Sequence, residues 1–256
     1  MRIVSLTCSN TEIVWALGKP EFLVGVDDHS DFPGDVVARL PRVGPDLDID
    51  VARVAALRPD LVLASLTVPG HERIVERLER AHLPFVVTEP VSVADVYSDV
   101  TRLGALLGAP TEAERVVSEM RAELEPTAEP SLGPSILVEW WPKPVIVPGR
   151  LSWVTQMIAA AGGTGPLDHE DVKSRPITDD EARRFDPAAV VIAWCGVPFG
   201  KYRPELVRRR PGWKGIAALE QGRIFALPEA FLGRPGPRLV HGVRELRRIV
   251  ASCARG

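Results

Sequence analysis

The first half of the chain alternates short apolar runs with segments of helical hydrophobic spacing. Four apolar runs predict buried strands, at residues 3–6, 23–26, 61–64 and 85–87. Three helices are expected between them: one that ends at Gly18, one at 51–57 and one at 72–81. Ser9 or Asn10 is expected to cap the first helix, and Asp50 the second. Strands that alternate with helices in this way predict a mostly parallel sheet with helices on both faces.

The middle of the chain differs because it contains no strand-like run. Residues 92–107 and 111–124 predict a long, nearly continuous helical segment, with a capping box at Ser92 and another at Thr111. Its apolar positions follow helical spacing: Val93, Val96, Val100, Leu103 and Leu107. A loop rich in proline and small residues follows at 126–134 and predicts a domain boundary.

Alternation of strands and helices resumes after this loop. Strands are expected at 136–139, 190–193 and 223–226, and helices at 152–161 and 238–252. The helix–strand unit at 51–64 has a counterpart at 179–193, in which Pro59 aligns with Pro187 at an offset of half the 256-residue chain. This match favours two similar lobes, each with its own sheet, although any helix–turn–strand unit has a similar pattern. Three parts are predicted: an N-terminal α/β lobe at 1–91, an interdomain helical linker at 92–125 and a C-terminal α/β lobe at 126–256.

Composition is that of an ordinary globular protein. Hydrophobic residues make up 45% and charged residues 25%, and the net charge is −3. The balance of charge argues against nucleic-acid binding. Three well-separated cysteines argue against a disulfide framework. The first residues lack the pattern of a signal peptide, which predicts a cytoplasmic protein; a trimmed mature form, located in the periplasm or otherwise outside the cytoplasm, is the alternative.

Sequence motifs of common enzyme classes are missing. We find no phosphate-binding loop, no dinucleotide fingerprint, no zinc-hydrolase helix and no nucleophile elbow. The histidines lack metal-site spacing among themselves: His29, His71, His82, His169 and His241. The sequence therefore favours a protein that binds a ligand without transforming it.

Tryptophan is unusually frequent in the second half, which holds five of the six. Trp140 and Trp141 follow one predicted strand, Trp194 and Cys195 follow another, and Trp153 lies at a helix start. Ligands of open α/β sheets bind beyond the carboxyl ends of the strands, so these rings are expected to contact a flat, mostly apolar ligand. The alternative is that they fill the core. Trp15 is expected in the core, and Trp213 is expected to anchor a surface loop.

Polar loops follow the strands of the first half. The candidate ligand contacts there are Ser9, Asn10, Asp28, His29, Ser65 and Leu66. His29 is also a candidate axial ligand to a chelate-bound cobalt or iron ion, because imidazole nitrogen suits such metals; the alternative is a solvated loop residue. Cys8 and Cys195 are expected to be small buried thiols.

Several segments together resemble the class III (helical-backbone) substrate-binding proteins of ABC importers, and their cobalamin-binding members most. The segments are RIVSLTCSNTE at 2–12, VGVDDHSDFP at 24–33, LRPDLV at 57–62 and GPR at 236–238. The resemblance spans nearly the whole chain. It implies an α/β fold of two Rossmann-like lobes joined by one long helix, with the ligand in a cleft between the lobes and an ABC permease as partner.

Position by position, the resemblance implies further assignments. His29 takes the place of a cleft aromatic residue, and Ser65 or Leu66 the place of a cleft tryptophan. Phe231 matches an aromatic residue of the second lobe, and Arg234 joins the expected ligand contacts. Glu72 matches a carboxylate that docks on the permease. The second docking carboxylate is replaced by Gly233, which weakens the case for docking.

Three hypotheses follow. The first is a monomeric, non-enzymatic binder of a corrinoid, with cobalamin or a related metal chelate as ligand and no required cofactor. The second is a cytosolic enzyme or chaperone that acts on a corrinoid, haem or iron–siderophore chelate through Cys8, Cys195 or His29. The third is a ligand-sensing adaptor that binds an acidic partner through the arginines at 208–210 and through Arg244, Arg247 and Arg248. The alternative is that these arginines form solvated charged faces.

Overall fold

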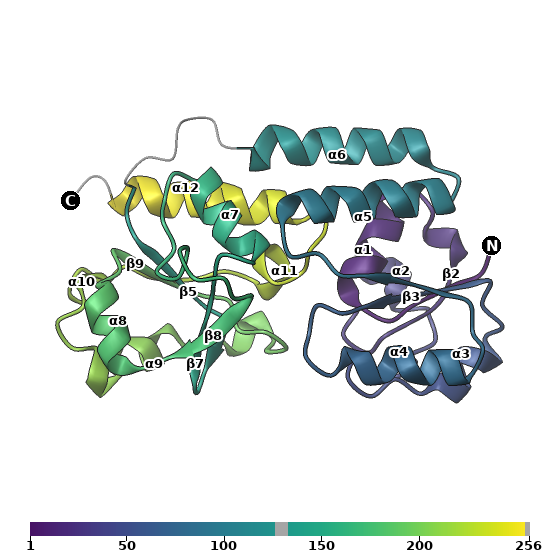
Figure 1. Ribbon diagram of the computed structural model, residues 1–256, viewed down its shortest axis with the longest axis horizontal. Coiled ribbons are helices and arrows are strands. Elements are labelled where there is room, and N and C mark those ends of the chain that lie inside the picture. The colour runs from purple at the N-terminus through teal and green to yellow at the C-terminus, as the bar shows by residue number, and fades with distance from the viewer. Residues whose placement is uncertain (126–132, 254–256) are drawn as a thin grey trace. The chain divides into compact units, whose positions relative to one another are not determined.

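The computed structural model describes residues 1–125 and 133–253, and most of the proline-rich loop at 126–134 lies outside them. The chain divides into two compact units. Unit 1 comprises Met1–Pro90 and Ala94–Glu119, and unit 2 comprises Val91–Val93 and Met120–Gly256. Each unit is built around its own parallel sheet (Figure 1).

Unit 1 contains a four-stranded parallel sheet in the order β2-β1-β3-β4. Its strands are β1 (Ile3–Ser5), β2 (Leu23–Val26), β3 (Leu61–Ser65) and β4 (Phe85–Thr88). All four strands predicted from the apolar runs are confirmed. On one face of the sheet, Val4 and Val62 are fully buried against Val54 and Leu78 of the helices. The alternate residues Ile3 and Leu63 are fully buried as well, so these runs are apolar on both faces.

The helices of unit 1 cover both faces of the sheet. Figure 1 shows α1 (Cys8–Ala16) on one side, with α3 (Val51–Ala56) and α4 (His71–Arg80) on the other. The remaining short elements are α2 (Gly34–Val37) and the 3-10 turn η1 (Pro20–Phe22). The Asp50 cap is confirmed, because its side chain accepts a hydrogen bond from the backbone N–H of Arg53 at 3.1 Å.

The predicted cap of the first helix is wrong. Thr7 is the N-cap residue of α1 and makes no side-chain cap bond. Ser9 and Asn10 lie inside the helix, because their side chains bond to neighbouring loops and strands instead of to the helix's own first turn.

The long helical segment consists of two helices, α5 (Val93–Leu106) and α6 (Pro110–Leu124). Gly108 ends the first with a left-handed φ of +65°, and Pro110 begins the second. Thr111 therefore lies inside α6, so its predicted capping box is wrong. The apolar stripe of α5 is buried as expected. Where the helices approach each other, a Cβ on Gly104 would overlap the methyl group of Ala113.

Unit 2 repeats the strand arrangement of unit 1. Its parallel sheet has the order β10-β9-β5, formed by β5 (Ile136–Glu139), β9 (Ala189–Ile192) and β10 (Ile224–Ala226). The middle strand β9 corresponds to β3, as the aligned prolines predict, and its partners correspond to β1 and β4. The core of unit 2 includes Leu137, Val190 and the fully buried Trp213.

A second sheet in unit 2 is absent from the sequence prediction. It is antiparallel, in the order β6-β7-β8, with β6 (Trp141–Pro142), β7 (Val145–Pro148) and β8 (Ser174–Ile177). Its strands contain prolines and are short, so they lack a clear alternating pattern. The helices of unit 2 are α7 (Trp153–Ala160), α8 (Asp179–Phe185), α9 (Pro204–Arg208), α10 (Ala217–Glu220), α11 (Glu229–Leu232) and α12 (Leu239–Cys253), with 3-10 turns η2 (Phe199–Lys201) and η3 (Pro211–Trp213).

Two tryptophans lie where the sequence does not predict them. Trp15 is 41% exposed and packs edge-on against Phe32 instead of lying in the core. Trp213 is fully buried, with Nε1 donating to Asp179 at 2.8 Å, because the proline–glycine turn before it folds inward against α8.

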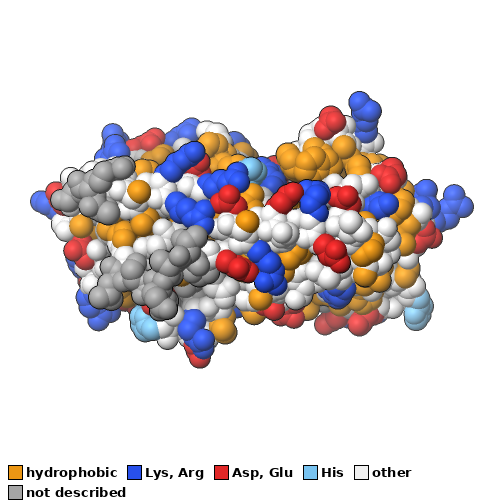
Figure 2. Space-filling model, turned by 90° about the horizontal axis from the view of Figure 1, so that it is seen from above, with side chains coloured by type: hydrophobic (Ala, Val, Ile, Leu, Met, Phe, Trp, Pro, Cys, Tyr) orange, Lys and Arg blue, Asp and Glu red, His pale blue; other side chains and the backbone are white. Residues whose placement is uncertain are grey.

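Charge is mixed on the surface. The face shown in Figure 2 carries lysine and arginine side chains interspersed with aspartate and glutamate, as the near-neutral composition predicts. Among the residues at 1–125 and 133–253, no helix has both the length and the apolar character needed to span a bilayer.

Candidate functional site

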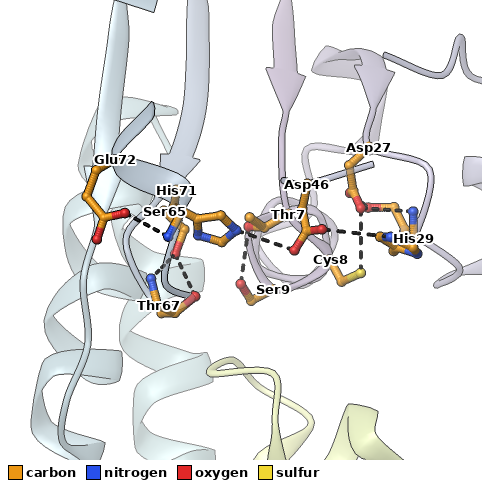
Figure 3. A network of polar contacts seen from close by, with 12 residues as sticks. Thr7, Cys8, Ser9, Asp27, His29, Asp46, Ser65, Thr67, His71 and Glu72 are labelled. Atoms are coloured by element: carbon orange, nitrogen blue, oxygen red, sulfur yellow. Dashed lines mark hydrogen bonds and ion pairs between the residues drawn. The ribbon is translucent and has the colours of Figure 1, made fainter. Parts of the chain in front are cut away.

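Polar loops meet at the carboxyl end of the parallel sheet of unit 1. Backbone hydrogen bonds continue past the strands: Asp27 N–H donates to Ser5 O at 3.0 Å, and Leu66 N–H donates to Thr88 O at 2.9 Å. The loops after β1, β2 and β3 therefore lie side by side (Figure 3). This edge is where ligands of open parallel sheets bind.

Asp27 is the buried centre of the loop after β2. Its carboxylate accepts hydrogen bonds from the Ser30 hydroxyl and from the His29 backbone N–H, the latter at 2.9 Å, and Cys8 Sγ lies 3.9 Å from Oδ2. Burial raises the pKa of Asp27, and these hydrogen bonds offset part of that rise. The loop is thus shaped by a carboxylate that neutral donors surround.

A chain of hydroxyl groups extends this network beneath the loops. Thr11 Oγ1 donates to Ser5 Oγ at 2.9 Å and lies 2.9 Å from Ser30 Oγ, while Thr7 and Ser9 hydroxyls are 3.3 Å apart. These side chains are buried. Because α1 begins directly after β1, its polar first turns fill the space below the neighbouring loops.

Asp46 lies between two histidines (Figure 3). Its Oδ2 is 3.3 Å from Nε2 of the buried His71, and its Oδ1 is 3.8 Å from Nε2 of His29, whose side chain is 52% exposed. The hydrogen bond from His71 holds the pKa of Asp46 below its usual value, against the opposing effect of burial. His71 Nδ1 is buried and has no hydrogen-bond partner within the described ranges.

The loop that carries His29 is fastened to the loop that carries Asp46. The Gly44 backbone N–H donates to Asp28 Oδ1 at 3.2 Å, and the Asp28 N–H donates to Gly44 O at 2.9 Å. Arg42 donates to the carbonyl oxygens of Asp27 and Ser30 at 2.8 and 2.7 Å. The exposed imidazole therefore projects from a braced loop.

Other residues of unit 1 that were predicted to contact the ligand make hydrogen bonds within the unit instead. The Asn10 amide donates to Ala64 O at 3.0 Å and accepts from the Thr88 hydroxyl at 3.2 Å, which ties α1 to β3 and β4. Ser65 is buried, 3.0 Å from the Thr67 hydroxyl, whereas Leu66 is half-buried. Leu66 and His29 are thus more accessible than Asn10 and Ser65. Their role as ligand contacts stays a prediction.

A buried ion pair lies at the carboxyl end of β5 in unit 2. Glu139 is fully buried and accepts two hydrogen bonds from Arg210, at 3.0 and 3.1 Å, and one from Trp194 Nε1 at 2.9 Å. The Arg210 guanidinium stacks on Trp213, 4.3 Å from the ring centroid. The sequence analysis missed this pair, because only the fold brings residues 139 and 210 together.

An aromatic row leads from this ion pair to the surface. Trp194 packs against Tyr202 with ring centroids 5.3 Å apart, and Tyr202 packs against Phe199 at 5.4 Å. Trp194 is buried and Phe199 is 51% exposed. The sequence analysis missed Phe199 and Tyr202; their position in the loop after β9 was the available signal.

A second aromatic group surrounds the start of α7. Trp140 is half-buried, 6.1 Å from the ring of Trp153, and Trp153 Nε1 donates to Leu232 O at 2.7 Å. Trp141 is 41% exposed and donates to Lys143 O at 3.1 Å. Trp141 is therefore at the surface, whereas Trp153 and Trp194 are buried.

The remaining predicted residues of unit 2 lie around α11. Phe231 is half-buried under the Arg238 guanidinium, 5.2 Å from the ring centroid, and Arg234 pairs with Glu229 at 3.0 Å. Cys195 is exposed, which corrects the expectation of a buried thiol. Packing around its sulfur, together with the nearby Glu229 carboxylate, raises the pKa of the thiol to about 12, so it is protonated at neutral pH.

At 1–125 and 133–253, no group of three or more histidine, cysteine, aspartate or glutamate side chains could hold a metal ion. Exposed side chains in the segments that follow the parallel strands include Trp141 and Phe199 in unit 2 and His29 in unit 1.

Comparison with known proteins is consistent with this geometry. A family model described as "Periplasmic binding protein" matches residues 3–231. The uncharacterized ABC transporter substrate-binding lipoprotein YvrC of Bacillus subtilis is 30% identical over 261 aligned residues, which cover 96% of this chain and 78% of the relative. The vitamin B12-binding protein of Pectobacterium carotovorum is 23% identical over 250 residues, covering 96% and 86%.

Solved structures show the same fold. The periplasmic haem-binding protein RhuT from Roseiflexus sp. RS-1, in its apo form, superimposes with a TM-score of 0.82 and 26% identity, covering 99% of this chain and 98% of that one. The relatives are binding proteins, so the comparisons do not support the enzyme hypothesis. The chain belongs to the periplasmic binding protein family and is a non-enzymatic substrate-binding component of an ABC importer.

Proposed function

We propose that this protein binds a corrinoid of the cobalamin type and delivers it to an ABC importer. The observation that carries the proposal is the exposure of Trp141 and Phe199 in the segments that follow β5 and β9. Large exposed rings suit the flat face of a macrocyclic chelate. The naming of a relative as a vitamin B12-binding protein supports the same ligand class.

Two kinds of contact are proposed: apolar area from Trp141 and Phe199, and polar contact from the loop that carries His29. Corrinoids carry amide side chains around an apolar ring, so they need both kinds of contact. Burial of the apolar part is worth about 25 cal/mol per Å² removed from water.

Haem is the second candidate. A similar solved structure is named a haem-binding protein, and the exposed imidazole of His29 suits iron as well as cobalt. A ferric siderophore is a third ligand to compare, because it is a metal chelate without a flat macrocycle. The three ligands separate the contribution of the ring from that of the metal.

The test is a fluorescence titration of the protein with cyanocobalamin, corrected for absorbance, with haem and a ferric siderophore measured in parallel. We expect saturable quenching with micromolar or tighter affinity for cyanocobalamin. Trp141→Ala is expected to weaken binding about tenfold, the size of a lost aromatic contact. Trp15→Ala is the matched control, because Trp15 is equally exposed, at 41%, but lies in unit 1 on α1.

Preference for haem over cyanocobalamin would move the assignment to haem. Failure of all three ligands to saturate would contradict a metal chelate as the substrate and leave the fold and the family untouched. An equal loss of affinity in the Trp15 and Trp141 variants would contradict a specific role of Trp141 in ligand binding.

Location outside the cytoplasm, in the periplasm or anchored to the cell surface, is part of the proposal. The family and the lipoprotein relative favour it over the cytoplasmic expectation. Fractionation of the native host, with detection by antibody, tests it directly. The monomeric state stays a prediction, which light scattering of the purified protein tests.

Docking on the permease is proposed to use Glu72, at the start of α4, whose carboxylate accepts a hydrogen bond from Gly70 N–H at 2.8 Å. In unit 2, Gly233 stands where the resemblance places the second docking carboxylate. Glu229 Oε1 lies 2.8 Å from the position that a Cβ on Gly233 would take, so the Glu229 carboxylate lies beside that position. Glu72→Arg is expected to weaken capture by the reconstituted permease. Glu76→Arg, an exposed position on the same helix, is the control.

A further inference from the structure

The exposed ring of His29 lies beside a carboxylate. Its backbone N–H donates to the Asp27 carboxylate at 2.9 Å, and its Nε2 faces Asp46 Oδ1 at 3.8 Å. The other ring nitrogen, Nδ1, makes no hydrogen bond to any residue at 1–125 or 133–253. One nitrogen therefore faces a carboxylate, and the other has no partner in the protein.

Asp46 is itself fixed from the opposite side. His71, whose side chain is 3% exposed, lies 3.3 Å from Asp46 Oδ2, and its backbone N–H donates to Val68 O at the start of α4. Figure 3 shows the carboxylate between the two imidazole rings, with its two oxygens turned to different histidines. The three residues form one row that runs from the buried helix start to the surface.

A carboxylate beside one imidazole nitrogen keeps the proton on that nitrogen. The lone pair then resides on the other nitrogen, and most histidines that bind metals are arranged in this way. Nε2 of His29 faces Asp46, so the proton belongs on Nε2 and the lone pair on Nδ1. The separation of 3.8 Å is longer than a hydrogen bond, as is common before a ligand is bound.

We propose that Asp46 orients His29 so that Nδ1 coordinates the metal of the bound chelate, and that the protein therefore selects chelates with an exchangeable axial ligand. This inference rests on the proposed function. The Nδ1 lone pair forms the new bond to the metal, and the axial water leaves with its own electron pair. No electron transfer is needed, because the metal keeps its oxidation state.

The selection has a chemical basis that other contacts do not supply. A corrinoid with axial water can exchange it for imidazole, whereas cyanocobalamin holds its cyanide tightly. Ring stacking and amide hydrogen bonds are the same for both molecules. Aquocobalamin also carries one more positive charge than cyanocobalamin, so a difference in affinity reports on coordination only when the visible spectrum of the corrinoid shifts as well.

The experiment compares aquocobalamin with cyanocobalamin near neutral pH, using tryptophan quenching for affinity and the visible spectrum of the corrinoid for coordination. The wild-type protein is expected to bind aquocobalamin about tenfold more tightly and to shift its visible bands. His29→Ala is expected to remove both the preference for aquocobalamin and the shift of the visible bands. Added imidazole is expected to restore the shift in this variant.

Asp46 is a positioning residue, and a matched pair of variants tests it. Asp46→Asn is expected to reduce the aquocobalamin preference about tenfold and weaken the spectral shift. Asp48→Asn, in the same loop, is the control, because the Asp48 side chain is 85% exposed and contacts only Arg77 among the described residues. Equal behaviour of the two variants would overturn the role of Asp46.

The outcomes separate this inference from the proposed function. Equal binding of both corrinoids without a spectral shift would overturn coordination by His29 and leave the corrinoid assignment standing. Absence of saturable binding for both would overturn both proposals. A shift that persists in His29→Ala would assign the metal to a different donor and overturn the inference.

Discussion

Each unit buries one carboxylate at the carboxyl end of its parallel sheet, but the two are stabilised differently. In unit 2, Glu139 is paired with Arg210 and bonded to Trp194. In unit 1, the carboxylate of Asp27 accepts hydrogen bonds from neutral donors, the Ser30 hydroxyl and the His29 backbone N–H, and lies near the more distant Cys8 thiol. The first arrangement joins segments that are far apart in sequence, and the second shapes a single loop.

The two carboxylates stabilise different parts of the structure. Arg210 comes from the segment after α9, so the Glu139 pair fixes that segment under the aromatic row. Asp27 instead fixes the backbone that presents His29. A buried charge with a counter-charge therefore serves tertiary attachment in unit 2, whereas a buried charge with hydrogen-bond donors serves local conformation in unit 1.

The largest expected effect is in unit 2. Glu139→Gln keeps the shape and the acceptor for Trp194 but leaves Arg210, whose side chain is 15% exposed, without its counter-charge. We expect a loss of about 3 kcal/mol in the free energy of unfolding, as for other broken buried pairs. Urea denaturation measures it. Glu76→Gln, which breaks an exposed pair, is expected to cost less than about 0.5 kcal/mol.

A loss below about 1 kcal/mol for Glu139→Gln would contradict the role of the ion pair. The double variant Glu139→Leu with Arg210→Met sharpens the result. It removes both charges, so it is expected to be less destabilised than the single variant.

A smaller effect is expected in unit 1. Thr11→Val removes the hydroxyl that contacts Ser5 and Ser30 while keeping the shape of the buried side chain. The expected cost is about 1–2 kcal/mol, because two buried hydroxyls each lose a partner. Hydrogen–deuterium exchange of the β1 and α1 amides measures it within unit 1. Thr101→Val, at an exposed position of α5, is the control; an equal effect there would argue against the network.

The smallest effect compares two aspartates within unit 1. Carboxyl-detected NMR titration is expected to give a pKa above the ordinary value of 3.8 for Asp27 and below it for Asp46. The contribution of Asp27 to stability is then fully present below that value and is lost as pH rises through its folded-state pKa. The contribution of Asp46 is present above 3.8 and is lost as pH falls through its folded-state pKa. If the pKa values of Asp27 and Asp46 were shifted in the same direction, the proposed difference between the two aspartates would be wrong.

Strands and caps that depend on local pattern were predictable from the sequence. The apolar runs of β1 to β4 and the cap at Asp50 needed no tertiary information. Elements set by contacts at a distance were not predictable. The sheet of β6, β7 and β8 owes its existence to packing in unit 2, and Trp15 and Trp213 have exposures opposite to expectation because their helix or turn faces the other way.

The same division applies to the candidate site. Position after a strand identified Trp141, Trp194 and His29, because the carboxyl end of a parallel strand is a local property of the chain. It did not identify Asp46 or Phe199, which reach their neighbours through loop geometry. The partner of a charged or aromatic side chain is a long-range fact, so it emerges only from the fold.

Close packing around Gly104 restricts which residues position 104 can hold. A Cβ at this position would overlap Ala113 and press against the carbonyl oxygen of Ala109 at 3.1 Å. Any larger residue would act as a wedge between α5 and α6, although position 104 belongs to no strand end and no polar network. In a library of random substitutions, this inconspicuous glycine is expected to be among the least tolerant positions of unit 1.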